Sequence, residues 1–211
     1  KLSSIIDLLS SDGNYSKTLE ALKKKGKVNP HPNLVALSLS KSKHSLLMWA
    51  HYAQNHEGII VGLDTSHPFF NQTIKPDKTS DEDTSFLGKV LPVTYDRVRP
   101  DFKLGLNFSE AILSKSDEWM YEKEYRMFLR KSDRNELGRD KEGKILNHVN
   151  LFRIPASSIV RIIIGVRSNY LKIISDFKKA ILTNKELSNV QLEKAELHKD
   201  LYHIIHKTIQ L

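Results

Sequence analysis

The sequence has 211 residues, no cysteine and a formal net charge of +8. A disulfide framework and a thiolate metal site are therefore excluded, and no apolar run approaches the roughly 20 residues that span a bilayer. The composition predicts a soluble, cytoplasmic, single-domain protein without a secretory signal. The positive charge favours an anionic partner, either a nucleotide, a nucleic acid or an acidic protein, although dispersed surface lysines explain the same excess.

Helical apolar spacing begins near the N-terminus, within residues 2–9 and 15–25, and a basic cluster follows at residues 23–27. The sequence opens without methionine inside a predicted helix. We therefore expect residues 1–211 to form one domain that lacks its N-terminal portion.

A strand–helix–strand unit is predicted next. Residues 35–40 alternate apolar and hydroxyl side chains, which is typical of a half-buried strand carrying Ser38 and Ser40 on one face. Residues 44–55 contain neither glycine nor proline and predict a helix, with Ser42 as its N-cap and Gly58 as the left-handed residue at its end. Residues 59–63 predict a short β-branched strand.

The rest of the chain mixes strands and helices. Residues 65–87 are rich in polar residues and predict a long surface loop, and residues 133–144 a charged, hairpin-like loop. Strands are expected at 89–95, 149–154, 159–166 (a central strand) and 190–199, helices at 106–115 and 170–182, and a strand or helix at 201–209. This order favours an α+β fold with mixed, mostly antiparallel sheets and flanking helices.

A polar row is predicted on residues 119–130. As one strand, this segment places Glu122, Glu124 and Arg126 on the same face, in steps of roughly 7 Å. Paired carboxylates can divide catalytic labour, and like charges so close raise the pKa of one of them unless Arg126 offsets the effect. An exposed face of mutually balanced charges gives the same pattern.

The predicted helix carries an unusual set of polar-tipped rings, namely Trp49, His51, Tyr52 and His56. Such side chains can contact a ligand, although a single histidine at a helix end more often has a capping role. A zinc site is not expected, because His51 and His56 are five residues apart and no third ligand motif accompanies them. The acidic triplet at residues 81–83 is interpreted as solvated loop, and no Walker, G-x-G-x-x-G or G-x-S-x-G motif is present.

Two of these segments together resemble a known family. M-W-A-H-Y-A-Q-N-H-E-G (residues 48–58) and W-M-Y-E-K-E-Y-R (residues 119–126) are similar to the hallmarks of a large bacterial family described only as a domain of unknown function. The resemblance runs from about residue 37 to about residue 202. The basic–aromatic strand and N-D-P-like segment that usually open the family are not found, which fits a missing N-terminus.

A second resemblance is to ADP-ribosyltransferases of the Arg–Ser–Glu type. Ser38-Leu39-Ser40 is similar to their S-x-S strand, which braces the nicotinamide pocket, and Glu122-Lys123-Glu124 to their E-x-E strand. This implies an α+β transferase fold with NAD as the nucleotide, Glu124 as the catalytic carboxylate and Glu122 as the acceptor-orienting one. The remaining expected nucleotide-binding side chains are Ser38, Ser40, Trp49, His51, Tyr52, His56 and Arg126.

Three functions follow as hypotheses. The first is an enzyme acting on NAD or a related nucleotide, in the setting of a toxin or phage-defence effector. The second is a non-catalytic module, binding nucleic acid or protein, in which the helix and the Glu/Arg strand lock together. The third is a metal-independent nuclease using His51, His56 and Glu124. The accessibility of Glu124 and His51 separates the first two hypotheses. An enzyme exposes both side chains to a shared cleft, whereas a non-catalytic module buries them with their partners satisfied.

Overall fold

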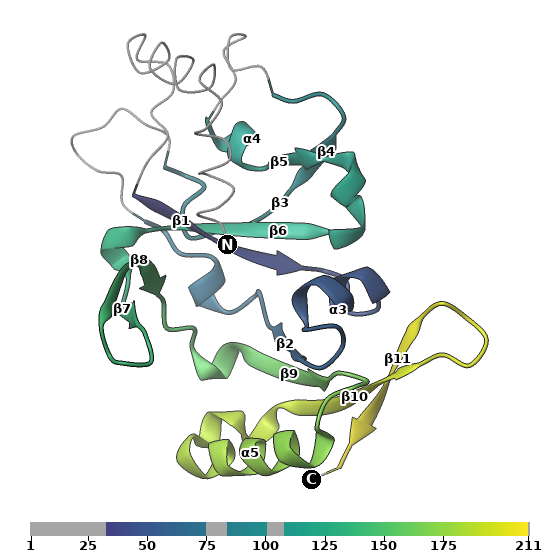
Figure 1. The fold of residues 1–211 in the computed structure, drawn as a ribbon. Coiled ribbons are helices and arrows are strands. Elements are labelled where there is room, and N and C mark those ends of the chain that lie inside the picture. The colour runs from purple at the N-terminus through teal and green to yellow at the C-terminus, as the bar shows by residue number, and fades with distance from the viewer. Residues whose placement is uncertain (1–32, 75–83, 101–107, 211) are drawn as a thin grey trace, which may run out of the picture.

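The computed structural model describes residues 33–74, 84–100 and 108–210, and the side chains of residues 147 and 148 are not described. The helices expected within 2–9 and 15–25, the basic cluster at 23–27 and the acidic triplet at 81–83 lie outside these ranges. Within them the chain forms two main sheets, one above the other in Figure 1. The mixture of helices with mostly antiparallel strands confirms the α+β prediction.

The first main sheet has the order β1–β6–β3 and is entirely antiparallel. Its strands are β1 (Leu34–Ser40), β6 (Glu124–Arg130) and β3 (Val90–Pro92). Because side chains alternate, one face is apolar and packs against Phe70 and Leu63. The other face pairs Ser38 with Arg126 and Ser40 with Glu124.

The second main sheet has the order β11–β10–β9–β2, in which only β9 and β10 run parallel. Its strands are β2 (Ile59–Leu63), β9 (Ile159–Ile164), β10 (Gln191–Leu197) and β11 (Ile204–Ile209). The interior position of β9 confirms the predicted central strand, and residues 201–209 contain a strand rather than a helix.

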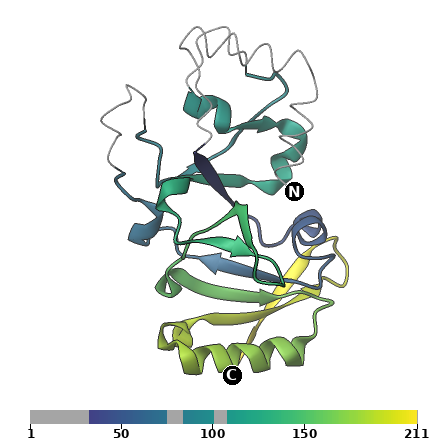
Figure 2. The same ribbon diagram turned by 60° about the vertical axis from the view of Figure 1, so that its left-hand side comes forward.

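Two helices cover opposite faces of this second sheet. Helix α5 (Tyr170–Thr183) packs through Phe177 against Leu192, and it lies along the outer side of the sheet in Figures 1 and 2. Helix α3 (Leu46–Tyr52) packs through Trp49 against Ile163 on the inner side. Helix α3 therefore stands beside both sheets, which brings its outer residues close to the end of β6.

Smaller elements complete the described part. Strands β4 (Thr94–Asp96) and β5 (Ser114–Ser116) form a parallel pair, and β7 (Glu136–Arg139) and β8 (Ile145–Leu151) form an antiparallel hairpin. Helix α4 (Phe108–Ile112) packs beside Phe86 and Phe128. The 3₁₀ turns are η1 (Pro68–Phe70), η3 (Asp117–Glu122), η4 (Lys131–Asp133), η5 (Ala156–Ser158) and η6 (Lys185–Asn189).

Helix α3 is shorter than the predicted 44–55, and its caps differ. The Ser45 side chain, rather than that of Ser42, accepts from the Met48 amide at 3.3 Å. After Tyr52 the chain leaves the helix through three consecutive positive φ angles, at Gln54, Asn55 and His56 (49°, 52° and 70°). Gly58 has no positive φ, so its prediction as the left-handed residue was wrong; its amide donates to the Ala53 carbonyl at 2.8 Å.

The single strand predicted over residues 119–130 was also wrong. The turn η3 occupies its first part, Lys123 has a left-handed conformation with φ 46°, and β6 begins only at Glu124. The Ser40 hydroxyl fixes this break by donating to the Glu122 carbonyl at 2.6 Å, and the Lys41 amide donates to the Lys123 carbonyl at 3.1 Å. Strand alternation therefore places Glu124 and Arg126 on one face, whereas Glu122 approaches them from the turn.

The bounds of other helices and strands also differ from the predicted ones. Residues 89–95 divide into β3 and β4 at Val93, and the described part of the predicted helix 106–115 holds α4 and then β5. Residues 65–87, expected as a surface loop, contain η1 and the buried side chains of Phe70, Phe86 and Leu87. Apolar anchors thus hold this segment to both faces of the first main sheet.

Candidate functional site

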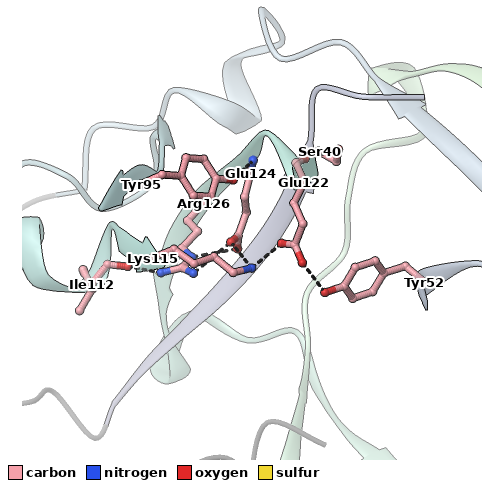
Figure 3. A network of polar contacts seen from close by, with 8 residues as sticks. All are labelled: Ser40, Tyr52, Tyr95, Ile112, Lys115, Glu122, Glu124 and Arg126. Atoms are coloured by element: carbon pink, nitrogen blue, oxygen red, sulfur yellow. Dashed lines mark hydrogen bonds and ion pairs between the residues drawn. The ribbon is translucent and has the colours of Figure 1, made fainter. Parts of the chain in front are cut away.

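Four charged side chains meet at the start of β6, and we call Lys115, Glu122, Glu124 and Arg126 the carboxylate cluster (Figure 3). Lys115 comes from β5, Glu122 from η3, and Glu124 and Arg126 from β6. The two positive and two negative charges balance. The turn at Lys123 allows both glutamates to approach one ammonium group from successive elements.

Glu124 is the most heavily bonded member of the cluster. Arg126 donates to it in a two-pronged contact, Nε to Oε1 at 2.9 Å and Nη2 to Oε2 at 3.0 Å, and Lys115 Nζ lies 3.0 Å from Oε2. Burial alone would raise the pKa of this carboxyl, but hydrogen bonds from Arg126, Lys115 and Ser38 outweigh burial and lower the pKa. Glu124 is therefore held as an anion at neutral pH, and Arg126 offsets the mutual repulsion of the two carboxylates, as the sequence pattern allowed.

Glu122 is bound from two sides. The Tyr52 hydroxyl donates to Oε1 at 2.7 Å, and Lys115 Nζ forms an ion pair with Oε2. Partial burial and then the Glu122 hydrogen bond raise the pKa of Tyr52. Because Tyr52 lies on α3, this contact ties the helix to the first main sheet.

Lys115 is the functional candidate that sequence reasoning missed. Its ammonium lies between both carboxylates and 5.2 Å from the Trp119 ring centroid. Burial alone would lower the pKa of Lys115, but its bonds to Glu122 and Glu124 raise it. Residue 115 ended a predicted helix, and nothing in that pattern indicates a contact with β6. Tyr95, whose hydroxyl accepts from the Glu124 amide at 2.7 Å, was also missed, because the pattern of its predicted strand does not indicate this contact.

The two serines of the S-x-S segment have different roles. Ser38 lies opposite Arg126, and its hydroxyl is bonded to the Glu124 carboxylate. The Ser40 hydroxyl is occupied by the Glu122 carbonyl and the Ser42 amide. The structure therefore joins Ser38 to the carboxylate cluster, and Ser40 to the backbone that positions Glu122.

Helix α3 separates its aromatic residues into two groups. Trp49 is fully buried, its Nε1 donates to the Lys43 carbonyl at 2.9 Å, and the His56 ring stacks on it at 6.3 Å. The Trp49 ring therefore belongs to the core, and the half-buried His56 ring packs against it. The predicted stacking of Trp49 on a ligand ring therefore has no exposed face to support it.

His51 and Tyr52 lie on the outer side of α3 and are exposed. The His51 ring is 6.2 Å from that of Tyr52 and 6.4 Å from that of Tyr121, which in turn is 6.0 Å from the Trp119 ring. Tyr52 is 63% exposed and Trp119 40%. We call these four rings the aromatic surface; its Trp119 ring lies beside Lys115, and its Tyr52 hydroxyl contacts Glu122.

The arrangement favours electrostatic work over proton donation by Glu124. A carboxylate with a lowered pKa can stabilise positive charge, and Arg126 and Ser38 fix its orientation.

No group of three or more His, Asp or Glu residues in the described ranges could hold a metal ion. None of the described helices is long and apolar enough to cross a membrane.

Comparisons with known proteins bear on this site in one respect. Neither the curated proteins nor the solved structures contain a match to this chain. One family model does match, over residues 48–127, which include every member of the carboxylate cluster and the aromatic surface but neither Ser38 nor Ser40. The region that carries the candidate site is thus similar to the family described as Protein of unknown function (DUF2971).

Proposed function

We propose that the protein is an ADP-ribosyltransferase-like enzyme that acts on NAD or a related nucleotide. The observation that supports this most is the Glu124 carboxylate, kept ionised by Arg126 and bonded to Ser38 on the adjacent strand. An S-x-S strand beside an E-x-E segment is the pairing that the resemblance to the Arg–Ser–Glu transferases requires.

In this proposal the bond between ribose C1′ and the nicotinamide nitrogen breaks, and its electron pair leaves with nicotinamide. C1′ becomes positively charged, and the Glu124 anion stabilises that charge. An acceptor oxygen or nitrogen, or water, then forms the new bond to C1′ and gives its proton to Glu122. His51, Tyr52 and Trp119 supply the ring faces that position the nucleotide.

Lys115 sets a condition on this chemistry. Its ammonium occupies the space between the two carboxylates, where the positive charge of the ribosyl group would have to develop. The substrate therefore has to displace Lys115, whose side chain is 21% exposed and whose ammonium lies 5.2 Å from the Trp119 ring centroid. The carboxylates of Glu122 and Glu124 then contact the positively charged ribosyl group in place of the Lys115 ammonium.

A non-catalytic binding module is the second candidate, and burial favours it. Glu122 and Glu124 are only 4% and 6% exposed, and each carboxylate oxygen has a protein donor. Such a closed network can serve to fix α3 against the first main sheet. Function would then lie in the aromatic surface and the positive charge of the chain.

Consumption of NAD separates the two candidates. The chain is incubated with labelled NAD and with total cellular RNA, DNA and protein, and Glu124→Gln is compared with Glu118→Gln, an exposed glutamate on the neighbouring turn. We expect NAD loss that Glu124→Gln abolishes and Glu118→Gln preserves, with the labelled fraction naming the acceptor. If folded protein consumes no NAD with any acceptor, the transferase proposal fails and the binding module takes its place.

A further inference from the structure

A cavity of about 610 Å³ lies on the side of the first main sheet that faces away from the carboxylate cluster. Tyr125 lines it, and because this residue stands between Glu124 and Arg126 on β6, its ring projects from the opposite face of the strand. The volume is within the usual range of pockets for small organic ligands. None of the four charged side chains of the carboxylate cluster lines this cavity, although Ser40, whose hydroxyl donates to the Glu122 carbonyl, lines it.

Apolar side chains form the floor of the cavity. Leu39 of β1, Leu63 at the end of β2, Phe70 of η1 and Val90 of β3 all line it and belong to one hydrophobic cluster. Two sheets and a 3₁₀ turn thus contribute to a single apolar wall. Such a wall suits the face of a flat ring system.

The rim of the cavity is positively charged. Lys41, directly after β1, and Lys89, directly before β3, both line it, and neither forms an ion pair with a described residue. Among the described residues, no aspartate or glutamate lines the cavity. The nearest acidic residue in the lining loop, Asp64, is already bound by the amide and hydroxyl of Ser66, at 2.9 and 2.7 Å.

Two uncharged groups on the rim also lack partners. The Tyr125 hydroxyl and the Asn71 amide make no side-chain hydrogen bond to any residue in the described ranges. Polar groups that converge on a cavity and remain unpaired can fix the orientation of a ligand. Here they stand beside two lysines without acidic partners, which together attract an anionic group.

We propose that this cavity binds a small organic anion with a flat ring system, of the class of nucleoside monophosphates. The ring lies on the wall of Leu39, Phe70 and Val90, and the phosphate lies between Lys41 and Lys89. The Tyr125 hydroxyl donates to the ligand from the side. The site does not depend on the proposed catalytic activity, because it shares no charged residue with the carboxylate cluster.

Calorimetric titration of the full chain with AMP tests the proposal. We expect saturable binding that weakens about tenfold in Lys89→Ala and further in the Lys41→Ala/Lys89→Ala pair, since each charge-assisted contact is lost. Adenosine, which lacks the phosphate, and inorganic phosphate, which lacks the ring, should each bind at least tenfold more weakly than AMP.

Two controls place the ligand. Lys199→Ala removes an exposed lysine elsewhere and should leave AMP binding unchanged. Leu39→Trp, which fills the cavity, should abolish binding while thermal unfolding remains cooperative. The proposal is overturned if wild-type protein does not bind AMP, or if the double lysine variant binds AMP as well as wild type.

Discussion

The Tyr52 hydroxyl donates a hydrogen bond to the Glu122 carboxylate at 2.7 Å, across 70 positions of sequence. Tyr52 is the last residue of α3, and Glu122 is the last of η3. The helix packs on the second main sheet, whereas the turn leads into β6 of the first. One side-chain contact therefore connects the two halves of the fold at the candidate site.

Replacing Tyr52 with Phe tests this connection. The change removes the hydroxyl and leaves Glu122 with Lys115 as its side-chain partner, so the free energy of unfolding should fall by about 1.5–3 kcal/mol, a typical value for a hydrogen bond to a charged group. Urea unfolding measures the difference. Tyr202→Phe is the matched control, because Tyr202 is fully exposed and should show no change. If Tyr52→Phe and wild type have equal unfolding free energies, this hydrogen bond does not stabilise the contact between α3 and η3.

Lys115→Met should have a larger effect. It leaves two buried carboxylates with Arg126 as the remaining cation of the cluster, and the expected loss of unfolding free energy is about 3–5 kcal/mol at neutral pH. The loss should shrink in acid, because protonated carboxylates no longer need the ammonium group. Lys199→Met, at an exposed lysine, should leave stability unchanged.

A double-mutant cycle sharpens the Lys115 prediction. In Lys115→Met/Glu122→Gln one negative charge is removed together with the positive one, so the double variant should be more stable than the sum of the single changes predicts. Additive effects would contradict a direct ion pair between the two side chains.

Regular periodicity predicted the second main sheet well. Strand β9 and helix α5 agree with the sequence to within a few residues, because a continuous β-branched run and an amphipathic stripe each leave few alternatives. Residues 119–130 show the limit of this approach. Alternation alone could not reveal that Lys123 adopts φ 46°, since the tertiary contact from Ser40 to the Glu122 carbonyl holds the break.

The candidate site was predicted in part, for physical reasons that differ between residues. Glu124 and Arg126 lie on one face of β6, as the alternation of side chains along a strand predicts. Ser38 lies opposite Arg126 on the neighbouring strand. Trp49 was assigned to the ligand, but Leu46, Trp49 and Ala53 have helical i, i+3, i+7 spacing, a signal that would have placed the indole in the core. Lys115 reaches the carboxylates only through the packing of β5 beside η3, and no local pattern encodes that.

Glu124→Gln gives a prediction for the unfolding free energy at acidic pH. The folded-state pKa of Glu124 is lowered, so its stabilising effect is complete above the unfolded value of roughly 4.3 and is lost as pH falls through the lower folded pKa. Near neutral pH the variant should be destabilised by about 3 kcal/mol, because Arg126 and Lys115 lose a partner. The difference between variant and wild type should shrink steadily below about pH 4.

Urea unfolding at a series of pH values measures this convergence. Glu118→Gln is the matched control and should run parallel to wild type throughout, since its side chain is exposed. A constant difference between Glu124→Gln and wild type from pH 7 to pH 3 would contradict an ionised Glu124.

His206 gives the last prediction, in a milder pH range. Its side chain is 4% exposed, and neither ring nitrogen has a side-chain hydrogen-bond partner among the residues that the structure describes. Burial lowers the pKa of His206 to about 4, and the charge of Lys43 and the nearby His44 act in the same direction, against Glu193. The unfolded chain therefore binds a proton at higher pH than the folded chain, and stability is complete above the unfolded pKa of roughly 6.5.

As pH falls from about 6.5 to about 4, this residue should cost the folded state up to about 3 kcal/mol, at roughly 1.4 kcal/mol per pH unit. His206→Gln removes the titrating group, so its unfolding free energy should fall less steeply than that of wild type across this interval. His51→Gln, at an exposed histidine of α3, should keep the wild-type slope. Parallel curves for His206→Gln and wild type between pH 6.5 and 5 would show that the buried ring does not resist protonation, because the carboxylates with lowered pKa titrate only below this range.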